Sequence, residues 1–128
     1  MAEGQNIPRA GTIIFTDLTV DGADEARDFY KKVIGWEHSD LSMGEYDDYV
    51  MTAPGGEGVA GICHQAGANQ GLPPVWLVYF GVADLQASLE ACRTNGGKVH
   101  TEPKEAIGPG SYAVIEYPAG SFCALSQL

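Results

Sequence analysis

Basic residues are scarce in this chain of 128 residues: seven Lys and Arg stand against 17 Asp and Glu, giving a formal net charge of −10. A surface of that sign repels phosphate backbones and anionic lipid. We therefore expect neither a nucleic acid nor a membrane as partner, whereas the charge suits a cationic ligand. Cysteine is also rare, with three residues at positions 63, 92 and 123. Their wide spacing argues against a disulfide framework and a zinc knuckle, so reduced thiols are predicted.

Long hydrophobic runs are missing as well. Stretches such as VWLVYF at residues 75–80 are far shorter than the roughly 20 residues of a membrane span. The first residues, MAEGQNIPRAG, contain no apolar core of a secretory signal. These absences predict a cytoplasmic protein. A hydrophobic content of 45% in a chain of this length predicts a single globular domain with its own core.

One helix is predicted in the stretch GADEARDFYKKVIGW, residues 22–36. Asp21 suits its N-cap, and Gly35 suits the left-handed position that ends a helix. Apolar side chains recur at helical spacing and predict the face that packs on the core, with Phe29 buried in it. These side chains are Ala26, Phe29, Tyr30 and Val33.

The chain runs through one order of elements twice. A strand at TIIFTDLTV precedes the first helix, and the strands WEHSDL, EYDDYVMTA and GVAGICHQ follow it. The second half has strand PPVWLVYFGV, a helix capped by Asp84, and strands KVHTEP, GSYAVIEY and SFCALSQL. A shift of 62 residues places Gly35 on Gly97, as an internal duplication requires. The sequence predicts an α+β fold of tandem β-α-β-β-β modules at residues 11–65 and 75–128, joined by a linker at 66–74.

The segments ARDFYKKVIGW, PPVWLVYFGVADLQASLEACRTNGGKV and YPAGSFCALSQ follow one another in an order that resembles the vicinal oxygen chelate superfamily. This superfamily contains glyoxalase I, bleomycin resistance proteins and extradiol dioxygenases, and the chain is most similar to its glyoxalase-like, lactoylglutathione-lyase-related branch. The resemblance covers about residues 11–128. It implies the glyoxalase/bleomycin resistance fold, in which curled mixed sheets form half-barrels around a cavity. It also implies that Trp36 packs where Gly35 turns the chain, and that two chains pair as a homodimer.

The resemblance further implies where a divalent metal would be held, because metal enzymes of this superfamily use a residue from the first and last strand of each module. Carried over by the register of strands and helices, these positions are Phe15, Gly61, Leu77 and Ala124. None of these side chains has a lone-pair donor, which a metal ion needs in place of its water. A slip of one residue brings in only Trp76, Cys63 and Cys123. We therefore predict no metal site and no cofactor.

Strand alternation extends the set of side chains predicted to line the cavity. The predicted ligand-binding residues are Phe15, Asp17, Tyr49, Cys63, Trp76, Leu77, Tyr79, Tyr112, Phe122 and Ala124. Asp17 is a weak candidate for catalysis, because a carboxylate on a core-facing strand must be paired, hydrated or functional. A structural hydrogen bond to the backbone or to Tyr79 is the simpler interpretation.

The other titratable residues are weaker candidates for a functional role. His38 and His100 occupy equivalent places in the two modules, which the duplication explains without a ligand role. His64 directly follows Cys63 on a strand, so the two side chains point to opposite faces and do not form a nucleophile pair. Glu116 precedes a turn and is predicted to be exposed.

Two functions remain open from the sequence. The first is a binding protein that holds an unidentified small organic ligand in the cavity between the modules without chemistry. The alternative is a lyase or isomerase of the same superfamily, working without a metal through Asp17, Tyr79 or Tyr112, or with a metal at an unconventional site. Glyoxalase activity is disfavoured, because its metal ligands and its Glu base are missing from their places.

Overall fold

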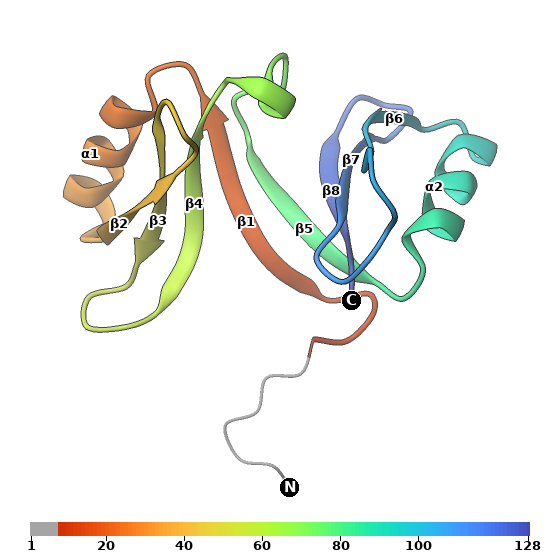
Figure 1. Ribbon diagram of the computed structural model, residues 1–128, viewed down its shortest axis with the longest axis horizontal. Helices are drawn as coiled ribbons and strands as arrows, with labels where there is room; N and C mark the ends of the chain where they lie inside the picture. The colour runs from red at the N-terminus through yellow and green to blue at the C-terminus, as the bar shows by residue number, and fades with distance from the viewer. Residues whose placement is uncertain (1–7) are drawn as a thin grey trace, which may run out of the picture. The chain divides into compact units, whose positions relative to one another are not determined.

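The chain forms two compact units, each with a sheet and one long helix (Figure 1). The structure is a computed structural model that describes residues 8–128. The first unit is Phe15–Leu77, and the second is Val78–Leu128 together with the described residues up to Ile14. The predicted α+β class and the repeated order of elements are confirmed. Among the described residues no helix is both long and apolar enough to cross a membrane.

The first unit contains strands β1 to β4 in the spatial order β2-β3-β4-β1. Their bounds are Ile13–Val20 (β1), Glu37–Ser42 (β2), Asp47–Thr52 (β3) and Gly58–His64 (β4). β1 pairs in parallel with β4, whereas β3 is antiparallel to both of its neighbours. Helix α1, Ala23–Ile34, connects β1 to β2 and lies on one face of this sheet (Figure 1). A short 3-10 helix, η1 (Gly67–Asn69), follows β4.

The second unit has the same plan, with the strand order β5-β8-β7-β6. Its elements are β5 (Trp76–Val82), α2 (Leu85–Thr94), β6 (Lys98–Thr101), β7 (Tyr112–Glu116) and β8 (Phe122–Gln127). β5 pairs in parallel with β8, and β7 is antiparallel to both of its neighbours. As predicted, α2 begins at Asp84, whose carboxylate accepts a hydrogen bond from the Ala87 N–H at 3.1 Å.

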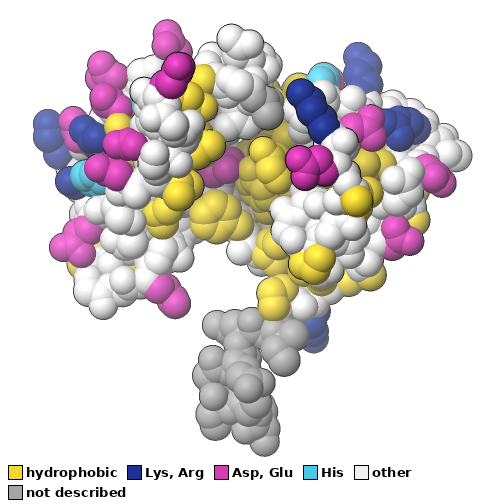
Figure 2. Space-filling model, in the orientation of Figure 1, with side chains coloured by type: hydrophobic (Ala, Val, Ile, Leu, Met, Phe, Trp, Pro, Cys, Tyr) yellow, Lys and Arg dark blue, Asp and Glu magenta, His cyan; other side chains and the backbone are white. Residues whose placement is uncertain are grey.

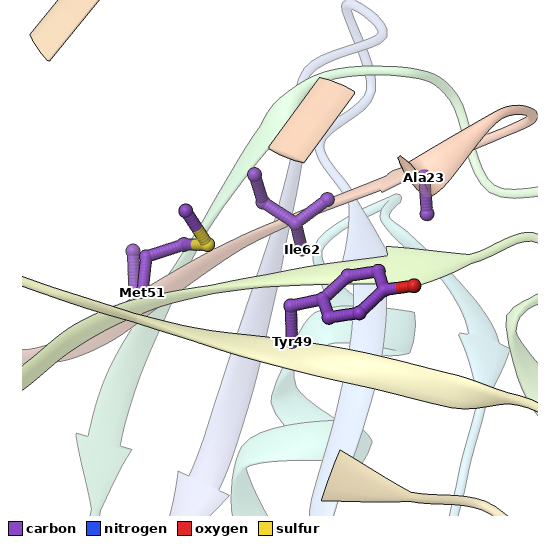
Figure 3. Packing of buried hydrophobic residues seen from close by; sticks show 5 residues of the cluster. Ala23, Tyr49, Met51 and Ile62 are labelled. Carbon is purple, nitrogen blue, oxygen red and sulfur yellow. The ribbon is translucent and has the colours of Figure 1, made fainter. Parts of the chain in front are cut away.

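Each helix packs on its sheet through alternate strand residues. Under α1 the buried cluster consists of Ala23, Tyr49, Met51, Ala60 and Ile62. Figure 3 shows Tyr49, Met51 and Ile62 on the same side of their strands. Tyr49 and Met51 are two residues apart on β3, and Ile62 is the partner of Tyr49 on β4. Under α2 the corresponding cluster consists of Leu85, Leu89, Ala113 and Leu125. Each unit therefore has its own core between helix and sheet.

The end of α1 follows the prediction, and its start does not. Gly35 adopts a left-handed conformation (φ 87°), and its N–H donates to the Lys31 carbonyl at 2.9 Å. Trp36 then packs against the buried cluster, with its ring centroid 6.1 Å from that of Tyr30. At the start, Gly22 rather than Asp21 occupies the N-cap, and no side chain of the described residues makes a capping hydrogen bond there. A left-handed backbone (φ 76°) at this turn favours glycine over aspartate.

The predicted burial of Phe29 is wrong. Its side chain is 56% exposed, and Val33 is 63% exposed. The apolar stripe of α1 is wider than its contact with the sheet, so only Ala23, Ala26 and Tyr30 reach the core. Phe29 and Val33 lie on the edge of the stripe that turns toward solvent.

The difference in burial between Met51 and Phe29 predicts that truncating Met51 destabilises the protein more than truncating Phe29. Met51→Ala, at a position with no exposed surface, should lower the free energy of unfolding by about 2–5 kcal/mol through lost burial and a cavity. Phe29→Ala should lower it by under about 1 kcal/mol, as for other exposed sites. Urea denaturation followed by circular dichroism measures both values, and equal losses for the two variants would contradict this assignment of the core.

Candidate functional site

In the first unit α1 covers one face of the sheet, and the other face carries the alternate residues of the same strands. Asp17 is paired with Gly61 and Thr19 with Cys63 across β1 and β4, and paired residues point to the same side of a sheet. Tyr49 and Ile62 point to the other side, toward α1. We call the side away from α1 the Asp17 face; it contains Phe15, Asp17, Asp48, Gly61 and Cys63.

The Asp17 face is closely packed at its centre. A Cβ atom added to Gly61 would lie 3.1 Å from the Asp17 Cβ and 3.6 Å from Cε2 of the Phe15 ring. The first distance is tighter than ordinary van der Waals contact, so glycine is the residue that lets Asp17 and Phe15 occupy this place. An apolar ring and a carboxylate thus lie together beside Gly61.

Asp48 is a buried carboxylate on this face that our sequence analysis did not single out. It is 3% exposed, and its Oδ1 accepts the His64 N–H at 2.9 Å. Its charge also lies close enough to the thiol of Cys63 to raise the pKa of that thiol. A signal was present in the sequence, because Asp48 stands within a predicted strand and directly precedes the apolar residues Tyr49 to Met51.

Burial raises the pKa of the Cys63 thiol, and the charges of Asp17 and Asp48 raise it further. The thiolate is the nucleophilic and metal-binding form of cysteine. Cys63 is therefore a neutral thiol near pH 7. His64 points to the other side of β4, where its Nε2 lies 3.5 Å from Asp24 Oδ1, and this confirms that Cys63 and His64 face opposite ways.

The second unit also has one face without a helix, and it gathers aromatic rings around a histidine. Strand pairing brings Tyr79 opposite Ala124, Val114 opposite Ala124 and Glu116 opposite Phe122. We call this the His100 face; it contains Tyr79, His100, Tyr112, Glu116, Phe122 and Ala124. The Tyr79 and Tyr112 ring centroids are 5.7 Å apart.

His100 is held from two directions. Its Nε2 lies 2.7 Å from Glu116 Oε1, and its ring stacks on Phe122 with centroids 4.8 Å apart and planes at 25°. The prediction that Glu116 is exposed is wrong, because its side chain is only 19% exposed in this contact. A carboxylate that orients an imidazole is an arrangement able to hold or move a proton. The sequence indicated neither the pair nor its position, since the two residues are on different strands.

Two predicted ligand-binding residues lie on the α1 side instead. Tyr49 packs in the core under α1, where its hydroxyl donates to Asp24 and the Arg27 guanidinium lies 4.6 Å from its ring centroid. The bond to Asp24 favours the neutral phenol and raises the pKa of Tyr49 to about 12. Trp76 packs against the same core, and its Nε1 donates to the Tyr30 hydroxyl at 3.2 Å. This orientation of Tyr49 and Trp76 differs from the one expected from the sequence.

The positions that the resemblance assigned to metal ligands are apolar or glycine. Leu77 is 4% exposed and Ala124 is fully buried, while Phe15 is 37% exposed and its ring lies beside Gly61. Within residues 8–128 no three His, Cys, Asp or Glu side chains are grouped to hold a metal ion. The binding roles predicted for Phe15, Asp17, Cys63, Leu77, Tyr79, Tyr112, Phe122 and Ala124 stay predictions.

This tandem arrangement agrees with a family match. Residues 12–122 match the model of the Glyoxalase/Bleomycin resistance protein/Dioxygenase superfamily. The chain belongs to this superfamily. It is 32% identical over 115 residues to a Mycobacterium tuberculosis protein provisionally named glyoxylase CFP32. The match covers 90% of this chain but 43% of that relative, so the chain spans less than half of the relative's length.

Solved structures of superfamily proteins share the fold. A glyoxalase/bleomycin resistance protein/dioxygenase superfamily member from Vibrio splendidus aligns with a TM-score of 0.59 at 14% identity, over 91% of this chain and all of that one. The Streptomyces coelicolor methylmalonyl-CoA epimerase, in complex with 2-nitronate-propionyl-CoA, aligns with a TM-score of 0.53 at 18% identity. This second alignment covers 93% of this chain and 98% of the epimerase. At these identities the alignments establish the fold of the superfamily and nothing about substrate.

The surface of this superfamily member is acidic. Figure 2 shows Asp and Glu side chains, in magenta, over both units, in keeping with the net charge of −10. Such a surface raises the local concentration of cations and lowers that of anions.

The thiol environment gives a testable consequence. The pKa of Cys123, like that of Cys63, is raised mainly by burial. At pH 8 both should react with Ellman's reagent at least about tenfold more slowly than glutathione, because little thiolate is present. Asp48→Asn should speed the labelling of Cys63 only in part, since burial remains. Mass spectrometry of the labelled peptides measures each rate, and reaction of Cys63 at the rate of glutathione would contradict this account.

Proposed function

We propose that this chain binds a small organic ligand without the help of a divalent metal ion, with ligand contacts on the helix-free sheet faces of its units, the Asp17 face of the first or the His100 face of the second. One observation carries the proposal: the four positions that the superfamily uses for metal ligands hold Phe15, Gly61, Leu77 and Ala124. Hydrocarbon side chains and glycine offer no side-chain lone pair to an ion. Packing supports this, because Phe15 already lies beside Gly61.

The chemistry of the two faces supports an organic ligand. Aromatic rings stand on these faces at Phe15, Tyr79, Tyr112 and Phe122. A few polar groups, Asp17 and the His100–Glu116 pair, stand among them. Small-molecule sites in proteins have this composition, with apolar walls for affinity and a few polar groups that fix orientation.

The second candidate is a metal-independent isomerase or lyase. The specific observation in its favour is the 2.7 Å contact between His100 Nε2 and Glu116 Oε1, with Phe122 stacked on the imidazole. A general base must be held in a fixed orientation toward the proton that it accepts. Here the base would be the imidazole of His100, and the contact with Glu116 fixes the orientation of that ring. The fold shared with methylmalonyl-CoA epimerase is compatible with isomerase chemistry but does not by itself support it.

A thermal-shift screen of organic compounds, with Ni²⁺, Zn²⁺, Mn²⁺ and Fe²⁺ in a parallel series, tests the proposal. We expect organic ligands to raise the melting temperature and divalent ions neither to raise it nor to be needed, because only binding to the folded state stabilises it. Elemental analysis of the soaked and desalted protein should find no stoichiometric ion. One ion per chain that survives removal of any affinity tag would contradict the proposal.

Two variants then separate binding from catalysis. Phe122→Ala removes a ring from the His100 face and should weaken binding, whereas Val33→Ala, on the exposed side of α1, serves as control. His100→Gln keeps a polar side chain but cannot act as a base. If a ligand that binds is also converted, and His100→Gln abolishes conversion while binding persists, the isomerase candidate replaces the binding protein.

We also propose that the protein is a homodimer. The match covers 43% of the M. tuberculosis relative, so that protein is long enough to contain a second segment of this size. In the present protein a second copy of the chain would take the place of that segment. In addition, β2 and β6 stand at the ends of the strand order among the described residues, and each presents an edge that a partner can cover. Light scattering at tens of micromolar should give twice the chain mass of 13.6 kDa, and a mass equal to one chain would refute the dimer.

A further inference from the structure

A second concave surface lies on the α1 side of the first unit, away from the Asp17 face. It is a groove of about 510 Å³ between the end of β1, the start of α1 and Pro74. Its volume is within the range of small-molecule sites. Phe29 and Tyr30 form one wall, with their rings edge to face at 5.1 Å and 88°. Leu18 and Val20 of β1 supply further apolar surface.

The charges at this groove have one sign. Asp21 and Glu25 line it, and none of the described residues that line it is basic. The basic side chains of α1 are placed elsewhere: Arg27 pairs with Asp28 at 2.9 Å, and Lys31 and Lys32 are in the last turn. Positive charge from the protein therefore does not neutralise the groove.

The start of α1 does not reverse this preference. A helix start favours an anion, and here Glu25 provides one: its Oε1 lies 2.9 Å from the place of a Cβ at Gly22, so the carboxylate folds back over the first turn. An external anion would have to approach Glu25 and Asp21 against their charge. A cation meets attraction from both.

We propose that this groove binds a hydrophobic organic ammonium ion, with the charged group at Asp21 and Glu25 and the apolar part against Phe29. The proposal accounts for the exposure of Phe29, because an exposed aromatic ring at the rim of the groove can contact both the apolar part and the charged group of such a ligand. Binding here involves neither the Asp17 face nor the His100 face, so this inference stands independently of the function proposed above.

The structure also supplies the means of detection. The chain has two tryptophans, Trp36 and Trp76, and the rings of both contact Tyr30 at the groove wall. Trp76 Nε1 in addition donates to the Tyr30 hydroxyl. A molecule bound against Tyr30 should change tryptophan emission without any added label.

The experiment titrates the protein with benzyltrimethylammonium, and with benzoate and benzyl alcohol as anionic and neutral probes of similar size. We expect a saturable change in tryptophan emission with the ammonium ion, weakened by added salt. Benzoate should bind at least about tenfold more weakly because of the two carboxylates. A response that is equal for benzoate and the ammonium ion, or absent for all three probes, would overturn the proposal.

Variants locate the binding. Asp21→Asn with Glu25→Gln should weaken ammonium binding by about five- to tenfold, and Phe29→Ala by about two- to fivefold. Val33→Ala on the same helix and Glu57→Gln before β4 match these changes outside the groove and should leave affinity unchanged. Urea denaturation verifies that each variant is folded. If instead Phe122→Ala or Asp17→Asn abolishes binding and the groove variants do not, the ligand sits on a helix-free face, and this inference fails while the proposed function stands.

Discussion

A single helix can cover only one face of a four-stranded sheet, and the distribution of residues in both units follows from this constraint. The covered faces hold side chains that have little need of water, such as Met51 and Ile62 under α1 and Leu89 under α2. The opposite faces hold groups that a small core would exclude: Asp17 and Asp48 in one unit, and His100 with Glu116 in the other. Two carboxylates of the first unit and the His100–Glu116 pair of the second therefore lie on the sheet faces that α1 and α2 do not cover.

The alternation of side chains along a strand was enough to predict which residues share a face of the sheet. It did not predict which of the two faces the helix covers. Cys63 and His64 do face opposite ways, because neighbours on a strand must. For β1 the metal-ligand positions of the superfamily gave a reference, and Asp17 indeed shares a face with Gly61. For β3 no such reference existed, so Tyr49 could be assigned to either face, and it lies under α1. Phe29 shows the same limit for a helix, where an apolar stripe does not reveal how much of its width touches the sheet.

The His100–Glu116 contact could not be read from the sequence for a different reason. It depends on the register between β6 and β7, which shifts between Val99 and Thr101. An irregularity of one residue reverses which side chains meet across a ladder. Contacts within a strand or a helix turn, such as Asp84 with Ala87, are local and were predictable. Contacts set by strand register are determined by the packing of the whole unit.

The crowding at Gly61 limits which residues can take its place in β4. A side chain at residue 61 would start 3.1 Å from the Asp17 Cβ and 3.6 Å from the Phe15 ring. Replacing Gly61 by a histidine or glutamate would therefore require β1 to shift by a few tenths of an ångström at Asp17, whereas the Phe15 ring is at an ordinary contact distance. The close atom is the Cβ of Asp17, so a smaller side chain at residue 17 relieves the contact only if that residue is glycine. A longer side chain at residue 61 can thus be introduced by design only together with an adjustment of the neighbouring strand.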